Sequence, residues 1–349
     1  MRRGECRVTS DKWFGTEKNM KKKLTVLTLY ALLFALCVPV QAQQTGKVLR
    51  VGFLDSTTAS GSAVLWDALR QELSKLGWIE GKNIIVESRF AGGRNDSLPE
   101  LAAELVRLKV DLIVVPGVQS ARAAMKATTI IPVVIASAPD PVGLGLVASL
   151  ARPGGNVTGL SSLTPELNTK RLEILKDAIP KLARVGLLWQ PRAAGGGGDT
   201  QLKELRSAAL ALKLKLEEIE TQADAKGLEN AFQIAKQKQV GAIMTGAART
   251  FFAERKRIVE LAGKYRLPAI YPQKEFVDEG GLMSYGADYD DLFRKAAHYV
   301  DKILKGTKPA DLPVQQATKF EFIINLKAAK QIGLTLSPDF LARANQVIK

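Results

Sequence analysis

Short apolar runs alternate with longer runs at helical spacing along most of this chain. Val48 to Asp55 is an apolar run that predicts a buried strand. Leucine and alanine then recur along one helix face from Val64 to Leu76, and Gly77 ends the run. Strand and helix repeated in this order are typical of a parallel sheet with helices on both faces. The sequence therefore predicts an α/β protein.

The same alternation occurs twice, with a restart after Gly154-Gly155-Asn156. Two similar sets in a chain of 349 residues predict two similar lobes, each with its own core. Ser97-Leu98-Pro99-Glu100 predicts a capping box at the start of one helix, which runs to about Leu108. Further strands are predicted at Asn83–Phe90, Asp111–Pro116, Ile131–Ala136, Val185–Trp189, Lys213–Ile219, Gly241–Thr245, Pro268–Tyr271 and Leu282–Tyr285. Further helices are predicted at Ser120–Ala127, Val142–Leu150, Leu167–Ile179, Thr200–Leu212, Leu228–Gln237, Phe251–Tyr265 and Asp288–Lys305.

The first 42 residues have the pattern of a removable leader. Met20-Lys21-Lys22-Lys23 is a basic start, and Leu24 to Val38 is almost wholly apolar. That run is shorter than the roughly 20 residues of a membrane-spanning helix, and Pro39 closes it. Val40-Gln41-Ala42 carries small residues at the two positions that a signal peptidase reads. We expect a signal peptide cleaved before Gln43, and export to the periplasm; a membrane anchor is the alternative.

The charge and the cysteine content narrow the class of protein that this chain can be. Both cysteines, Cys6 and Cys37, lie in the leader, so no disulfide and no thiol chemistry is expected of the mature protein. The formal net charge is +15, but no block of five or six like charges marks a nucleic-acid tail. We interpret the basic surplus as a solvated surface and expect no nucleic-acid partner.

Motifs of catalysis are missing from the sequence. The single histidine, His298, lies within a predicted helix, and no His/Cys/Asp cluster has metal-ligand spacing. No Gly-x-Ser-x-Gly elbow occurs, and the glycine-rich loop Ala193 to Gly198 lacks the Gly-Lys-Ser/Thr of a phosphate loop. The sequence therefore favours binding over catalysis, with no metal and no cofactor.

Three segments resemble a known family. The first is Ile131-Pro132-Val133-Val134 leading into Asp140 to Val147, and the second is Arg152 to Gly159. The third is Gly280 to Gly286, followed by the helix that ends at Tyr299 to Gly306. Together they resemble the solute-binding proteins of ABC transporters, in the family that includes tryptophan and tyrosine uptake components. The similarity covers nearly all of residues 48–349.

The resemblance implies the fold of type I periplasmic binding proteins, in which two Rossmann-like lobes with parallel sheets are joined by a three-segment hinge and close on a ligand. It places the crossovers near Gly159–Ser162, Leu282–Tyr285 and Pro313–Ala317. Lobe 1 would comprise residues 47–161 and 285–312, and lobe 2 residues 162–284 and 313–349. The restart of the alternation falls at the first of these crossovers.

Ligands of open α/β sheets bind beyond the carboxyl ends of the strands. That rule selects six loops, which are Asp55–Ser62, Gly117–Ser120 and Ser137–Asp140 in lobe 1, and Trp189–Pro191, Thr245–Arg249 and Tyr271–Gln273 in lobe 2. Helix N-termini in such a cleft would hold a carboxylate. The candidate ligand-binding residues in and near these loops are Asp55, Thr57, Thr58, Gln119, Ser120, Asp140, Trp189, Thr245, Tyr271 and Asp288.

Several candidates also have a purely structural interpretation. Asp140 could cap the helix predicted after Pro141, and Ser120 and Asp288 could cap their own helices. Trp189 and Tyr271 could pack in the core instead of stacking on a ligand.

Ala247-Ala248 departs from the family, whose members often carry a polar or acidic pair there. This weakens the case for an amino-group contact in lobe 2. It leaves open a ligand without an ammonium group, or an acid held by Arg249.

The resemblance implies an exported, monomeric, non-enzymatic protein that captures a small organic ligand and delivers it to an ABC permease. The expected ligand is an amino acid, aromatic ones included, or a related carboxylate. The alternative is a periplasmic sensor that presents the same fold to a membrane receptor.

Overall fold

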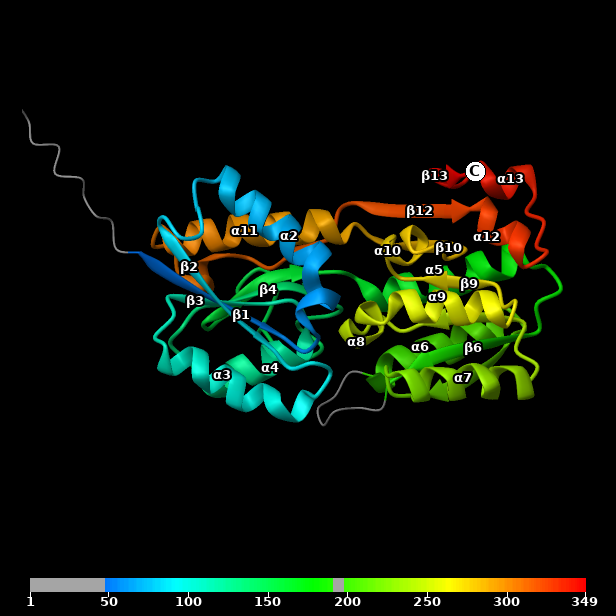
Figure 1. Ribbon diagram of the computed structural model, residues 1–349, viewed down its shortest axis with the longest axis horizontal. Coiled ribbons are helices and arrows are strands. Elements are labelled where there is room, and N and C mark those ends of the chain that lie inside the picture. The colour runs from blue at the N-terminus through cyan, green and yellow to red at the C-terminus, as the bar shows by residue number, and fades with distance from the viewer. Residues whose placement is uncertain (1–47, 191–197) are drawn as a thin grey trace, which may run out of the picture. The chain divides into compact units, whose positions relative to one another are not determined.

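The computed structural model of the protein describes residues 48–190 and 198–349. The predicted leader and residues 193–197 of the glycine-rich loop lie outside the described residues. The described chain forms two sheets, each flanked by helices (Figure 1). Within these ranges, no helix combines the length and the apolar character that a membrane crossing requires.

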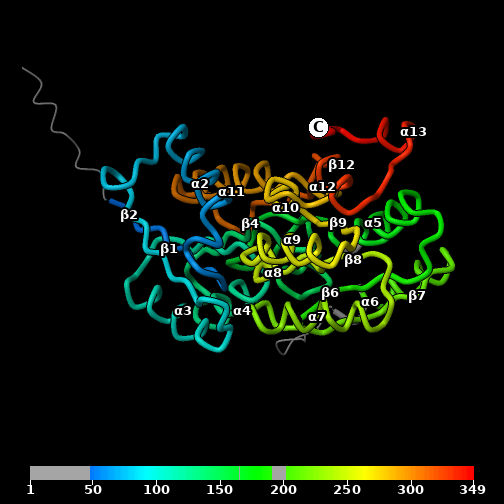
Figure 2. Tube along the Cα trace, turned by 45° about the vertical axis from the view of Figure 1, so that its right-hand side comes forward, coloured from blue at the N-terminus to red at the C-terminus, as the bar shows by residue number. Residues whose placement is uncertain are grey.

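The first sheet has six parallel strands in the order β11-β5-β4-β3-β1-β2. They are β1 (Leu49–Asp55), β2 (Ile84–Phe90), β3 (Leu112–Val115), β4 (Val133–Ala138), β5 (Val157–Ser161) and β11 (Gln315–Gln316). The flanking helices are α2 (Ala59–Lys75), α3 (Leu98–Arg107), α4 (Val118–Ala127) and α11 (Tyr289–Leu304). α2 lies beside α11, and α3 packs on α4 (Figures 1 and 2).

Successive side chains of β1 enter different cores, as the pleat of a strand requires. Phe53 packs with the residues of α2 and α11, and Leu54 packs with those of α3 and α4. Both side chains are fully buried. A strand covered on both faces has no solvent side, which explains why β1 is a continuous apolar run.

The second sheet has seven strands in the order β13-β12-β10-β9-β8-β6-β7, parallel except for the antiparallel pair β10–β12. They are β6 (Arg184–Trp189), β7 (Lys215–Glu220), β8 (Ala242–Thr245), β9 (Ala269–Tyr271), β10 (Met283–Ala287), β12 (Phe320–Asn325) and β13 (Gln346–Ile348). The helices around it are α5 (Thr164–Ala178), α6 (Gly198–Ala211), α7 (Ala225–Gln237), α8 (Arg249–Ala253), α9 (Arg255–Lys264), α10 (Glu275–Asp278), α12 (Leu326–Gln331) and α13 (Pro338–Leu341).

The chain passes between the two sheets three times. It leaves the first sheet after β5, returns after β10 to form α11 and β11, and ends in the second sheet with β12 and β13. The predicted fold class, two α/β lobes with mainly parallel sheets, is thereby confirmed. We call the part built on the six-stranded sheet the first lobe, and the other part the second lobe. The exact division of the chain into lobes stays a prediction.

Three local predictions were wrong. Residues 141–150 form turns instead of a helix, because Gly145 adopts a φ of +65° and glycine is a poor helix former. Ser97 makes no capping bond; its hydroxyl donates to the carbonyl of Arg94 instead (2.8 Å). The helix predicted over Phe251–Tyr265 is two helices, α8 and α9, which meet at Glu254.

Candidate ligand-binding site

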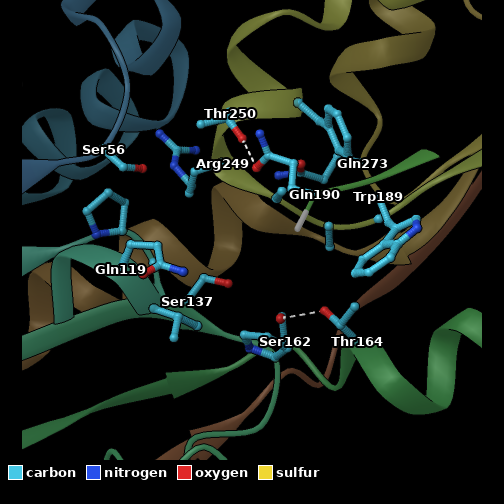
Figure 3. A pocket seen from close by; sticks show the side chains of 18 of the residues that line it. Ser56, Gln119, Ser137, Ser162, Thr164, Trp189, Gln190, Arg249, Thr250 and Gln273 are labelled. Carbon is cyan, nitrogen blue, oxygen red and sulfur yellow. Dashed lines mark hydrogen bonds between the residues drawn. The ribbon is translucent and has the colours of Figure 1, made fainter. Parts of the chain in front are cut away.

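A cavity of about 530 Å³ lies between the lobes, at the carboxyl ends of their strands (Figure 3). Its volume falls in the range of small-molecule sites, roughly 300–1,000 Å³. Each of the six predicted cleft loops contributes to the lining: Ser56, Gln119 and Ser137 come from the first lobe, and Gln190, Arg249 and Gln273 from the second. The rule of the strand carboxyl ends therefore locates the cavity.

The first lobe presents hydroxyl and amide groups and the N-terminus of α4. Gly117 is the N-cap of α4, and no side chain caps that end. Gly117 and Gln119 both line the cavity. Ser137 does too; it is only 5% exposed, and its hydroxyl has no hydrogen-bond partner among the described residues. Because Ser137 lines the cavity, this hydroxyl can bond a ligand or water there.

The start of α5 forms another part of the wall. The hydroxyls of Ser162 and Thr164 share a hydrogen bond of 3.0 Å (Figure 3), and Asn168 follows one turn later. The amide oxygen of Asn168 accepts a bond from Arg171, whose guanidinium also donates to the carbonyl of Tyr285 (3.0 Å). Complete burial lowers the pKa of Arg171 to about 10. Arg171 thus positions Asn168 on the cavity wall.

The second lobe contributes an aromatic face and two further amides. Trp189 ends β6 and lines the cavity, and its indole N–H is buried without a partner among the described residues. Thr250 donates to the amide oxygen of Gln190 (Figure 3). Gln273 is 5% exposed, and its side chain also lacks a partner within the described part of the chain. This wall can stack on a flat ligand and hydrogen-bond its edge.

Arg249, the first residue of α8, lies on the wall and joins the two lobes. Its Nη2 donates to Asp55 (2.8 Å) at the end of β1 and to Ser62 (3.2 Å) in α2. Burial by itself would raise the pKa of Asp55. The charge of Arg249 and hydrogen bonds from Arg249, Ser62 and the Thr57 amide outweigh burial, so the pKa of Asp55 lies below its ordinary value. Asp55 is therefore ionised, and both of its carboxylate oxygens accept hydrogen bonds within the protein.

Comparison with known proteins decides the family. Residues 61–348 match the family of ABC transporter substrate-binding proteins. The chain belongs to that family. A tyrosine-binding protein of Clostridioides difficile is 27% identical over 270 residues, which is 75% of this chain and 74% of that protein.

Two solved structures show the same architecture. A conserved domain protein from Vibrio cholerae is 28% identical with a TM-score of 0.79, over 86% of this chain and 100% of that one. A protein from Streptococcus pneumonia, solved in complex with L-Trp, is 25% identical with a TM-score of 0.77, over 86% and 99%. Substrate-binding proteins bind their solutes without transforming them, which confirms the expectation of a non-enzymatic protein. No group of three or more potential metal ligands occurs among the described residues.

Of the candidates named from the sequence, Gln119 and Trp189 line the cavity of this substrate-binding protein. Asp55 is behind the wall, where it anchors Arg249. The backbone N–H of Thr57 donates to Asp55 (3.1 Å), and Thr58 caps α2 by accepting from the Gly61 N–H (3.0 Å).

The remaining candidates lie near the cavity but do not line it. Ser120 is buried and donates to the Gly117 carbonyl (3.2 Å), and Asp140 accepts from the Gly143 N–H (2.9 Å). Thr245 is fully buried in β8.

Tyr271 stacks on Phe276 with ring centroids 4.7 Å apart. Asp288 caps α11 by accepting from the Asp291 N–H (2.9 Å). Ligand contact by any of the ten candidates stays a prediction.

Three of the lining residues that were not named follow a simple rule. Ser56 and Gln190 come one position after the last residue of β1 and β6, and Gln273 comes two positions after β9. At these three strand ends a polar residue one or two positions past the strand faces the cleft, and at β6 the last strand residue, Trp189, lines the cavity as well. A shift of one or two positions past each strand end would have found these three residues.

Proposed function

We propose that this protein is exported, captures a small organic ligand in the cavity between its lobes, and delivers it to an ABC permease. The ligand class is an amino acid, aromatic ones included, or a related carboxylate. The observation that carries the proposal is the cavity itself, because both lobes line it with polar side chains, of which Ser137 and Gln273 lack partners among the described residues, beside Trp189.

The relatives support an aromatic ligand. One is named for tyrosine binding, and another was solved with L-Trp. The indole of Trp189 and the side chains of Leu187, Leu202 and Leu205 form an apolar part of the cavity wall in this chain. An aromatic ring placed against them would lose its water and stack, which contributes about 0.5–1.5 kcal/mol beyond area burial.

A thermal-shift screen of amino acids and aromatic carboxylates tests the binding function. A ligand at 100 times its dissociation constant stabilises the folded protein by about 2.7 kcal/mol. We expect at least one aromatic carboxylate to raise the melting temperature. Trp189→Ala should weaken that ligand at least tenfold, whereas Trp189→Phe keeps an aromatic face and should lose less. No shift with any member of the panel would contradict the proposed ligand class.

Export is tested separately. We expect the mature chain to begin at Gln43, because Val40-Gln41-Ala42 ends the apolar run. N-terminal sequencing of the periplasmic fraction gives the answer. A full-length protein retained in the membrane would contradict this part of the proposal.

A further inference from the structure

The described part of the cavity wall carries a single charge, and that charge is positive. Among the described side chains that line it there is no aspartate and no glutamate, and Arg249 is the one charged residue. The remaining polar groups are amides and hydroxyls, including Gln119, Gln190 and Gln273. A ligand ammonium enclosed here would meet no carboxylate, and a buried ion without a counter-charge is costly.

The nearest carboxylate behind the wall is not available to a ligand. Asp55 is 0% exposed. One of its oxygens accepts from Arg249 (2.8 Å) and Ser62 (2.7 Å), and the other accepts from the Thr57 N–H (3.1 Å). An ammonium could reach Asp55 only by displacing Arg249, which would leave the guanidinium buried and unpaired.

Donors for an anion, in contrast, converge on the cavity. Arg249 lines the cavity and supplies its positive charge, although its Nη2 is bonded to Asp55 and its Nε and Nη1 are buried away from the cavity without a partner among the described residues. The N-termini of α4 and α5 carry no side-chain cap, and residues of both first turns line the cavity. Uncapped N–H groups at a helix N-terminus favour a negative charge. The buried and unpartnered side chains of Ser137 and Gln273 add further donors on either lobe.

We propose that the ligand is a carboxylate with an apolar, flat body and no ammonium group. The inference rests on the proposed function and narrows its ligand class. The carboxylate accepts hydrogen bonds from the helix N-termini, Ser137 and Gln273 near the charge of Arg249, and the body lies against Trp189 and the neighbouring leucines. A free α-amino acid carries the same carboxylate but adds an ammonium that the described wall does not neutralise.

Matched ligand pairs test this directly by calorimetry on the purified protein. One pair is 3-(4-hydroxyphenyl)propanoate and L-tyrosine, and the other is 3-(indol-3-yl)propanoate and L-tryptophan; the members of each pair differ only in the amino group. We expect the deaminated acid of at least one pair to bind ten times more tightly or better. Equal or tighter binding of the amino acid in both pairs overturns the inference and leaves the proposed function standing. No binding by any of the four overturns both.

A charge placed on the wall gives an independent test. Ala247 lines the cavity, so Ala247→Asp adds a carboxylate there, and Ala247→Asn adds a neutral group of the same shape. We expect Ala247→Asp to shift the ratio of the two affinities at least tenfold toward the amino acid, and Ala247→Asn to leave the ratio unchanged. Melting curves establish that both variants are folded. A folded Ala247→Asp protein with the original ratio contradicts the inference.

Discussion

At the scale of single residues, Asp55 and Arg249 form a buried ion pair between the lobes. Asp55 is fully buried and the Arg249 side chain is 12% exposed, so water screens the pair little. Gly117 leaves room for the side chain of Arg249, because a Cβ at position 117 would lie only 2.9 Å from Cγ of Arg249. The same arginine therefore joins the lobes and faces the ligand cavity.

We expect Asp55→Asn to lower the free energy of unfolding by about 3–5 kcal/mol, because it leaves the charge of Arg249 buried without a partner. The double variant Asp55→Asn/Arg249→Gln removes both charges and should recover part of that loss. Urea denaturation of the wild type, both single variants and the double variant gives the coupling energy. Additive effects would show that the two side chains do not interact.

The same pair predicts a response to acid. Since the pKa of Asp55 in the folded protein lies below its unfolded value of about 3.9, its stabilisation is complete above that value. It is lost as the pH falls through the lower folded pKa. The double variant should therefore lose less stability than the wild type below about pH 4, as measured by urea denaturation.

The candidate site shows how far residue types can be interpreted without a structure. The carboxyl ends of the strands were predictable, because apolar runs end abruptly at Asp55, Trp189 and Tyr271. The orientation of each side chain was not, since it depends on the pleat and on the opposite lobe. Tyr271 is the last residue of β9 and stacks on Phe276 in the core, whereas Gln273 lines the cavity.

At the scale of elements, α11 begins at a residue with two possible roles. Asp288 accepts a hydrogen bond from the Asp291 N–H at the start of α11 and does not line the cavity. We expect Asp288→Ala to cost about 1 kcal/mol and Asp288→Asn to cost little, because asparagine caps nearly as well. Calorimetry with an identified ligand should show unchanged affinity for Asp288→Asn. A tenfold loss of affinity would instead establish Asp288 as a ligand contact.

The short helix α10 begins with a carboxyl group in an unusual environment. Glu275 is 3% exposed, and both of its carboxylate oxygens are without a partner among the described residues. Burial, together with the nearby Asp290, raises the pKa of Glu275 to about 7. Between roughly pH 4.5 and 7 the folded protein keeps a proton that the unfolded chain releases, so stability falls as the pH rises.

Glu275→Gln should remove this loss. The wild type is expected to lose about 3 kcal/mol from this group between pH 4.5 and 7, at 1.36 kcal/mol for each pKa unit, and the variant should not. Urea denaturation at pH 5 and pH 8 measures the difference between the two proteins, in which the other titrating groups cancel. If the free energy of unfolding changes equally between pH 5 and pH 8 in the wild type and the variant, Glu275 titrates near its ordinary pKa.

The helices and strands that sequence periodicity located well are those buried on two faces or along one long stripe, such as β1 and α11. Local signals misled where tertiary context overrides them. Ser97 sits in a helical conformation (φ −81°, ψ −16°) as the last residue of a 3₁₀ turn over Asn95–Ser97, so its hydroxyl cannot reach forward as a cap. No helix or strand was predicted from the sequence after Gly306. β12 and β13 lie in that segment and pair with a sheet formed by earlier parts of the chain, which local periodicity does not indicate.

At the scale of the whole molecule, the two lobes touch on either side of the cavity wall. Arg249 of the second lobe pairs with Asp55 of the first. α2 also packs on α8, where a Cβ built on Gly61 would lie only 2.7 Å from the Cβ of Ala253. Three passages of the chain connect the lobes, and so few connections can act as a hinge. The cavity lies between the lobes, so opening these contacts would widen it.

We therefore expect ligand to bring the lobes together, so that the radius of gyration in small-angle scattering falls on saturation. Gly61→Leu places a side chain where α2 meets α8 and should hold the lobes apart, which keeps the radius high and weakens binding at least tenfold. Gly263→Leu is the matched control, because Gly263 lies in α9 with no atom within 4 Å of a built Cβ. The control should close like the wild type. If the wild-type radius does not change at saturating ligand, or if Gly61→Leu binds and closes normally, the α2–α8 contact is not part of closure.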